Sequence, residues 1–443
     1  TVGGAAAQAP PPSRPPNVIL ILADDLGFGD LGCYGQRQIQ TPVLDRMAQE
    51  GMRFTQAYSG STVCAPSRCT LMTGMHNGHG RVRDNIPHGV FLQPDDVTVA
   101  EVLKTAGYQC GVFGKWSLGN PGSWGKPRQQ GFDEWFGYLN QDQAHIYYPE
   151  EIWENDREEL LMGNRAGARK QYMPDLCTDR AVEFVEKNRH NPFFLYLPYT
   201  LPHWSDFPPN SVMSQDVPSD APYSKEAWPE VERKYAAMVT RLDGYVGRLL
   251  DTVKKQGLDS NTLVIFTSDN GPSAEALHRP AFFKSGGPYR GVKRELYEGG
   301  IRVPMIARWP GRVAAGKTSD HACAFWDVLP TLGELAGLPP PKGIDGLSFA
   351  PELMGRSQAK HDFLYWDYGL TRDKFCQALH WKDWKLVRNG IHSTPELYDL
   401  AKDPGESRDV ASANPGVVRD MLQMIASAYR PSPDYPVKEL AGK

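Results

Sequence analysis

The chain has 443 residues, of which 40% are hydrophobic and 23% charged, and its formal net charge is −4. This length suits one large domain plus a smaller one, and the composition is that of an ordinary globular protein. The slightly acidic balance gives no reason to expect nucleic-acid binding, which needs a basic surface. No apolar run approaches the roughly 20 residues that a transmembrane helix needs.

Residues 1–16 (TVGGAAAQAPPPSRPP) are small, rich in proline and without apolar periodicity, which predicts a disordered leader. Such a segment often follows the cleavage site of a signal peptide, so we expect a periplasmic or secreted protein. An expression tag or a cloning scar is the alternative origin of this segment.

Short apolar segments then alternate with helical patterns. The first helix has Thr41 as its expected N-cap and Pro42 in its first turn. Continuous apolar strands in β-α order predict a mostly parallel sheet covered by helices on both faces. The expected strands are 17–23, 108–113, 192–199 and 262–267, and the expected helices are 41–50, 98–105, 175–188 and 235–256.

The pattern changes after about Gly346, where short aromatic segments lie close together. Segments 363–366, 376–379, 384–388 and 397–399 predict a small antiparallel sheet. The predicted fold is therefore α/β, with a large, mostly parallel sheet sandwiched by helices in residues 17–345. Residues 346–443 are predicted to form a smaller C-terminal α+β subdomain built on the antiparallel sheet.

Oxygen-bearing side chains follow two of the expected strands directly. Asp24 and Asp25 come after the first strand, and Asp269 and Asn270 come after the strand 262–267. Sites in parallel sheets form beyond the carboxyl ends of strands, and carboxylates brought together there call for a cation. Hard oxygen donors without imidazole or thiolate favour calcium or magnesium over zinc. Helix capping and a tight turn are the alternative roles of these residues.

Seven cysteines are present, none in a CxxC or Cys/His zinc pattern, and their pairing cannot be deduced from sequence. One of them, Cys64, begins the run Cys-Ala-Pro-Ser-Arg, which ends at Arg68 and continues as Cys-Thr-Leu-Met-Thr-Gly. Here the chain resembles the type I sulfatase family of the alkaline phosphatase superfamily. The resemblance extends over nearly the whole chain and includes Gly114-Lys115-Trp116, Leu201-Pro202-His203, Gly291-Val292-Lys293 and the run 298–304 (EGGIRVP).

The resemblance implies that a maturing enzyme, formylglycine-generating or anaerobic, oxidises Cys64 to formylglycine, and that 17–345 is the catalytic domain. The aldehyde hydrates to a geminal diol; one hydroxyl, its pKa lowered by calcium, attacks sulfur and displaces the alcohol. The second hydroxyl loses its proton, which expels sulfate and restores the aldehyde. Serine would remain as a stable sulfate ester, and unmodified cysteine lacks the second hydroxyl.

Other roles follow from the resemblance and from charge development. Residue 64 is expected to join Asp24, Asp25, Asp269 and Asn270 around one calcium ion. Sulfate oxygens gain negative charge in the transition state, which calls for surrounding cations. By resemblance these cations are Arg68, in the turn after Cys64, with Lys115 and Lys293. His203 is expected to protonate the leaving alkoxide.

One position departs from the family pattern, which usually has G-K-W-H-L-G where this chain has Ser117 in place of the histidine. Serine is no base near neutral pH, so another residue must accept the proton when sulfate leaves, or turnover is impaired. His145 is the predicted substitute because its polar, aromatic loop resembles a segment of sulfatases with the same departure. His76 and His79 are weaker candidates.

The predicted substrate is a small-molecule or glycan sulfate ester, with a carbohydrate favoured. Aromatic faces pack on sugar rings, so a sugar-binding rim is expected from Trp204, Asp206, Tyr147 and Tyr148. An aryl or small alkyl sulfate is the alternative substrate. Two other functions remain open: a phosphatase or phosphodiesterase of the same superfamily, against which the lack of metal-binding histidines counts, and a non-catalytic sulfated-glycan binding protein, suggested by Ser117.

Overall fold

The computed structural model describes residues 14–85, 89–141, 143–205 and 214–440. A ten-stranded sheet has the order β11-β2-β10-β9-β1-β8-β4-β5-β6-β7, with its five central strands, from β9 to β5, parallel. Its strands are β1 Asn17–Asp24, β2 Met52–Phe54, β4 Gln109–Lys115, β5 Glu134–Tyr138, β6 Glu151–Glu154, β7 Arg157–Leu160, β8 Phe193–Pro202, β9 Thr262–Ser268, β10 Met305–Arg308 and β11 Lys317–Ser319.

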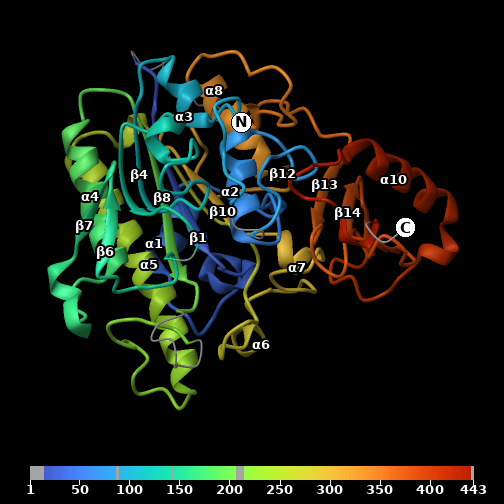
Figure 1. Cartoon of the computed structure of the whole chain (residues 1–443), viewed down its shortest axis with the longest axis horizontal. Helices are drawn as coiled ribbons and strands as arrows, with labels where there is room; N and C mark the ends of the chain where they lie inside the picture. The colour runs from blue at the N-terminus through green and yellow to red at the C-terminus, as the bar shows by residue number, and fades with distance from the viewer. Residues whose placement is uncertain (1–13, 86–88, 142, 206–213, 441–443) are drawn as a thin grey trace, which may run out of the picture.

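Helices cover both faces of this sheet (Figure 1). Alternate residues of β1 enter two separate cores: Ile19 and Ile21 pack with helices α1, α4 and α5, and Val18 and Leu20 with α2, α3 and α8. The predicted fold class is confirmed. The helices are α1 Pro42–Gln49, α2 Cys64–Thr73, α3 Val99–Lys104, α4 Met173–Lys187, α5 Glu230–Lys255, α6 Pro280–Phe283, α7 Glu298–Ile301, α8 Val328–Leu335, α9 Ala350–Leu353 and α10 Pro415–Ala428.

Local sequence explains where several elements begin. Helix α3 starts with a capping box, in which the Thr98 hydroxyl accepts from the Glu101 amide and the Glu101 carboxylate accepts from the Thr98 amide. Thr41 occupies the N-cap position of α1, but its side chain makes no cap hydrogen bond and accepts from the Gly32 amide instead. All eight residues of β1 and all ten of β8 are buried, as their unbroken apolar runs predict.

A four-stranded antiparallel sheet follows near the C-terminus, at the red end of the chain in Figure 1, as predicted. One face packs on α10 through Tyr365 and Leu379, and the other packs on the large domain through Trp366 and Ala378. This sheet therefore has an apolar surface on both sides. Its strands are β13 Leu364–Tyr368, β14 Cys376–Trp381, β15 Trp384–Asn389 and β16 Glu396–Asp399; a two-stranded pair, β3 Ala57–Tyr58 and β12 Cys323–Ala324, lies apart from both sheets.

No helix within the described residues is long and apolar enough to cross a membrane. All seven cysteines are free thiols.

Candidate active site

The ends of β1 and β9 bring four polar side chains together. The strands pair up to Ala23 and Ser268, so the residues that follow them meet at one edge of the sheet. The Asp269 amide donates to the Ala23 carbonyl (3.0 Å), and the Asn270 side-chain amide donates to Asp25 Oδ1 (2.7 Å). Asp24, Asp25, Asp269 and Asn270 are at most 2% exposed.

Helix α2 begins at Cys64 and presents its side chain to this group. The Cys64 thiol donates to Asp24 Oδ1 at 3.4 Å and is 1% exposed. The next amide, of Ala65, donates to the side-chain oxygen of Asn85 at 2.9 Å. No sequence pattern pointed to Asn85, because its contact with Ala65 depends on how the chain returns to the start of α2.

Arg68 lies one turn into α2, which corrects the prediction that it sits in a turn after Cys64. The run contains proline and serine, which are common in turns but also favour the first turn of a helix. Arg68 is fully buried, with Nε and Nη2 donating to Asp269 Oδ2 (3.1 and 2.7 Å) and Nη1 to the Lys115 carbonyl (2.6 Å). It therefore braces the ends of β4 and β9 from within α2.

Two lysines reach the same carboxylates from other elements. Lys115, the last residue of β4, donates from Nζ to Asp24 Oδ2 at 2.8 Å. Lys293 Nζ donates to Asp25 at 2.9 Å and lies 3.5 Å from Cys64 Sγ. Together with Arg68, they set three basic side chains against three carboxylates inside the protein.

Two histidines, His203 and His145, lie next to the two lysines. His203 Nε2 lies 3.3 Å from Lys293 Nζ and 3.4 Å from Asp25 Oδ2, while its Nδ1 hydrogen-bonds to the Trp204 carbonyl. The ring of His145 stacks on His203 with centroids 3.9 Å apart, and its Nε2 lies 3.5 Å from Lys115 Nζ. The loop after β5 thus places His145 beside Lys115 and His203.

The pKa values of the three acids in the cluster shift in different directions. Burial opposes ionisation of Asp24, but Lys115, His203 and Arg68 outweigh it and hold the pKa well below its usual value. Burial raises the pKa of Asp25 to about 7, because Lys293 only partly offsets burial and the neighbouring Asp24 and Asp269 charges. Burial, assisted by Asp24, also raises the pKa of Asp269.

The donor set fits a hard cation. Asn270 Oδ1 is buried and has no hydrogen-bond partner, and it stands beside the three carboxylates. Asp24, Asp25, Cys64 and His203 also form a group whose potential ligand atoms all lie within 4.8 Å of one another. An orphaned amide oxygen among crowded carboxylates is what a calcium ion would satisfy.

The space left by Ser117 opens into a small pocket. Ser117 has a positive φ of 68°, and its buried hydroxyl has no hydrogen-bond partner. The pocket has a volume of about 130 Å³, begins beside Ala65, and is lined by polar side chains that include Asp84, Asn85, Ser117, Asn120, Asn140 and Gln141. His76 and His79 lie away from it, past the C-terminal end of α2 and beside Asp345.

The predicted sugar-binding rim is wrong in one member. Tyr147 is 1% exposed, and its hydroxyl donates to the carbonyls of Thr200 and His203. It is therefore buried and holds the backbone of His203 instead of facing a substrate. Tyr148 is half-buried under the Arg169 guanidinium, and Trp204 packs against His203. Asp206 lies outside the described residues.

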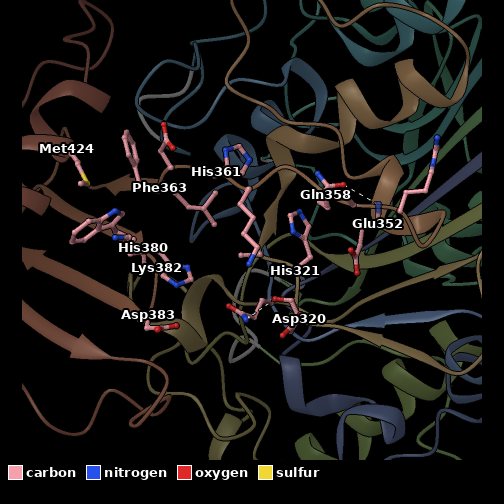
Figure 2. Close-up of a pocket in the computed structure, with 18 residues that line it drawn as sticks. Asp320, His321, Glu352, Gln358, His361, Phe363, His380, Lys382, Asp383 and Met424 are labelled. Atoms are coloured by element: carbon pink, nitrogen blue, oxygen red, sulfur yellow. Dashed lines mark hydrogen bonds between the residues drawn. The ribbon is translucent and has the colours of Figure 1, made fainter.

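A larger cavity than the one beside Ala65 lies elsewhere. Its volume is about 1030 Å³, and it is lined by side chains such as His321, Glu352, His361 and Lys382 from the large domain and the C-terminal sheet (Figure 2). None of the predicted site residues lines it. Cavity size therefore does not point to the predicted site residues.

Comparisons with known proteins find similarity over most of the chain. A family model described as "Sulfatase" matches residues 16–338, and one described as "N-sulphoglucosamine sulphohydrolase, C-terminal" matches residues 291–427. The chain is 32% identical to mouse N-acetylgalactosamine-6-sulfatase, covering 91% of this chain and 83% of that protein. It is 32% identical to human arylsulfatase A, covering 93% and 87%. The crystal structure of Ps i-CgsB with k-i-k-neocarrahexaose matches with a TM-score of 0.81 at 28% identity, covering 96% and 95%.

Proposed function

This chain belongs to the sulfatase family, and we propose that it is a calcium-dependent hydrolase of carbohydrate sulfate esters whose nucleophile is formylglycine made from Cys64. That it is a sulfuric ester hydrolase follows from the family match and from named sulfatases that are about one-third identical over most of the chain. The nucleophile, the metal and the substrate class are the parts proposed here.

The observation that carries the proposal is the setting of Cys64. Its Sγ lies 3.4 Å from Asp24 and 3.5 Å from Lys293, at the buried start of α2. A diol at this position would stand between a metal-binding carboxylate and a cation that can hold a sulfate oxygen. The maturing enzyme would act on the chain before this segment is buried.

Asp24, Asp25, Asp269, Asn270 and residue 64 would hold the calcium ion. When bound, the ion supplies positive charge that lowers the pKa of the attacking hydroxyl and offsets charge on the sulfate. The three carboxylates and three basic side chains of the cluster balance without it. A dication therefore gives the site a net positive charge, which an anionic sulfate ester would offset.

The basic side chains have distinct tasks in this scheme. Lys293 contacts the Cys64 thiol and Lys115 contacts Asp24 beside it, and both lysines would bind the sulfate oxygens. Arg68 already donates hydrogen bonds to Asp269 and to the Lys115 carbonyl. It would therefore hold these two residues in place and add its positive charge to the site. The three basic side chains would therefore not act as equivalent sulfate ligands.

His203 would protonate the leaving alkoxide from Nε2. Its Nδ1 is held by the Trp204 carbonyl, which fixes the proton on Nδ1 and directs Nε2 toward Lys293. Burial, then His145 and Lys293, lower the pKa of His203 well below its usual value. The negative charge of a bound sulfate would oppose this shift, so substrate itself would help to protonate the acid.

His145 would accept the proton that leaves the second hydroxyl when sulfate departs. It stands on the Lys115 side of the cluster and stacks on His203, while Ser117 occupies the position of the family's usual histidine. Lys115 connects it to the nucleophile's surroundings, because Nζ contacts both His145 and Asp24. The smaller Ser117 side chain leaves open the pocket beside Ala65.

That pocket supports a carbohydrate as the substrate. Its lining offers amide and hydroxyl groups, and the Ser117 hydroxyl and both polar atoms of the Gln141 amide are buried without partners. Sugar hydroxyls would satisfy such groups, whereas an aryl ring would leave them unpaired. One relative is named N-acetylgalactosamine-6-sulfatase, and a similar structure was solved in complex with k-i-k-neocarrahexaose. Both names favour a carbohydrate substrate. A periplasmic or secreted location would give access to sulfated glycans.

The test is sulfate release from a panel of sulfated sugars, with an aryl sulfate and an aryl phosphate for comparison. Protein matured in a host with a formylglycine-forming enzyme should release sulfate from at least one sugar with a higher kcat/KM than from the aryl sulfate. Cys64→Ala, matured in parallel, should release none. Preference for the phosphate, or sulfate release by Cys64→Ala, would contradict the proposal.

A further inference from the structure

A second group of potential metal ligands lies outside the active site. Among the described residues, His76, His79 and Asp345 form the one other cluster of three such side chains whose ligand atoms lie within 4.8 Å of one another. Two of its members follow the end of α2, and the third lies in the segment that leads to the C-terminal subdomain. The cluster belongs to no step of the proposed reaction.

The spacing of its atoms suits a small transition-metal ion. Asp345 Oδ1 lies 2.9 Å from His79 Nδ1 and 3.7 Å from His76 Nε2. Metal bonds of 2.0–2.1 Å place neighbouring ligands of a tetrahedral zinc about 3.3 Å apart, between these two distances. The two rings stack with centroids 4.2 Å apart and planes at 27°, so both can turn toward one point beside the carboxylate.

The unpaired nitrogens of His76 and His79 are a second observation that points to a ligand at this cluster. His76 is 7% exposed, and its Nε2, the nitrogen that faces Asp345, is too far from the carboxylate for a hydrogen bond. The other nitrogen of each ring, His76 Nδ1 and His79 Nε2, is buried without a partner. Buried imidazole nitrogens are normally paired, because an unpaired polar group loses its hydration without compensation.

We propose that His76, His79 and Asp345 bind one divalent transition-metal ion of the zinc class. Two imidazoles and one carboxylate are the donor types that zinc prefers, in contrast to the oxygen-rich active site. The Asp345 side chain is 19% exposed, which leaves a side open for solvent as the fourth ligand.

The ion joins the end of α2 to the start of the C-terminal subdomain. The amides of Asp345 and Gly346 already donate to the Gly74 carbonyl (3.0 and 3.1 Å), and Gly74 ends α2. A metal there holds the far end of the helix whose first residue is Cys64. Its role is structural.

The test measures metal content in a Cys64→Ala background, which removes the active-site thiol as a competing ligand. Protein equilibrated with micromolar zinc and desalted should retain one zinc per chain by plasma mass spectrometry. His76→Gln and His79→Gln should each lose it, whereas calcium content stays unchanged. The matched control is His278→Gln, since His278 also pairs with a carboxylate, that of Glu232 at 2.5 Å, but belongs to no group of three potential metal ligands among the described residues.

Cobalt gives a readout that does not depend on the variants folding. The background protein loaded with Co²⁺ should show the visible absorption bands of a four-coordinate ion, and zinc should abolish them. No bands and no retained zinc in the background, or equal zinc in His76→Gln, His79→Gln and the control, would overturn the proposal. Asp345→Asn, which preserves side-chain shape, should lose zinc with an unchanged near-ultraviolet circular dichroism spectrum.

Discussion

Among the described residues, two of the buried clusters of charge differ in which polar groups they leave unpaired. The active-site cluster comprises Asp24, Asp25, Asp269, Arg68, Lys115 and Lys293. The interface cluster lies between the large domain and the C-terminal sheet and comprises Tyr58, Glu298, Arg302, Lys385 and Glu406. Both remove carboxylates and cations from water, which is expensive unless the charges are paired.

Glu298 and Asp25 show the difference most clearly. Both oxygens of Glu298 have donors: Lys385 (2.7 Å) on one, Arg302 (3.0 Å) and Tyr58 (2.9 Å) on the other. Burial opposes its charge, but Lys385 and Arg302 outweigh burial and lower its pKa to about 2. Asp25 is equally buried, yet its pKa rises to about 7.

The cause is the arrangement of like charges. Glu298 faces two cations, whereas Asp25 stands between two other carboxylates and has Lys293 as its closest cation. Glu298 is thus fully paired without a ligand, and the interface cluster joins two parts of the protein. Its other carboxylate, Glu406, keeps one buried oxygen without a hydrogen-bond partner, and burial raises its pKa to about 7. The active-site cluster holds an unpaired amide oxygen and crowded carboxylates, which only a bound cation would settle.

The largest expected effect comes from replacing the nucleophile of the active-site cluster. Cys64→Ser should lose steady turnover by roughly 10⁵-fold or more, the scale of a lost covalent nucleophile. The serine can attack sulfur but has no second hydroxyl to expel it. Intact-protein mass spectrometry after incubation with substrate should detect the sulfate ester; steady multiple turnover would show that the diol is not required.

Removing the metal should come next. Exhaustive chelation of calcium, or Asp269→Ala, should lower kcat by roughly 10³-fold or more, since a metal supplies several kcal/mol of charge stabilisation. Calcium should restore the chelated protein but not the variant. The matched control is Lys385→Met in the interface cluster, which should retain calcium and kcat; equal activity after chelation, or bound zinc in the active site in place of calcium, would remove the distinction between the clusters.

His145 sharpens the comparison within the active site. His145→Ala should lower kcat by roughly 10²–10⁴-fold, the usual effect of a lost acid or base. Sulfated enzyme should accumulate, because release rather than attack becomes limiting. His190→Ala, at an exposed histidine, is the control and should behave as the unaltered protein. A raised KM with unchanged kcat would instead make His145 a substrate-binding residue.

A substitution in the interface cluster should lower the stability of the protein and leave catalysis unchanged. Lys385→Met removes the closest cation of Glu298 and should lower the free energy of unfolding by about 3–5 kcal/mol, as for a broken buried ion pair. Denaturant titration measures this change, and kcat per folded molecule should stay within about twofold. A large loss of kcat in folded protein would show that the two clusters are coupled.

The sequence predicts an element most reliably where its residue pattern fits one type of structure. Unbroken apolar runs form β1, β8 and β9, and their polar ends meet because parallel strands end at one edge. Strands β2, β6, β7, β10 and β11 have three or four residues each, too short for a periodic signal, and β5 also escaped prediction. Tyr147 was assigned to a rim because residue type cannot distinguish a ring facing substrate from one buried behind His203.

The contacts of the site depended on tertiary structure in the same way. The sequence favoured His145 by resemblance. Its stacking on His203 arises because the loop after β5 packs against the segment that follows β8. Asn85 and the pocket beside Ala65 carry no local signal, since their neighbours come from segments far apart in the chain. Long-range packing, rather than local pattern, sets which polar groups remain unpaired.

The central claim is that residue 64 becomes an aldehyde, and the mass of the peptide that contains it is the most direct measurement. Protein purified from a host with a formylglycine-forming enzyme should yield this peptide with formylglycine or its hydrate at position 64, in proportion to specific activity. The same chain from a host without that enzyme should carry the thiol and be inactive. Full activity in a preparation whose peptide retains only unmodified Cys64 would contradict the account.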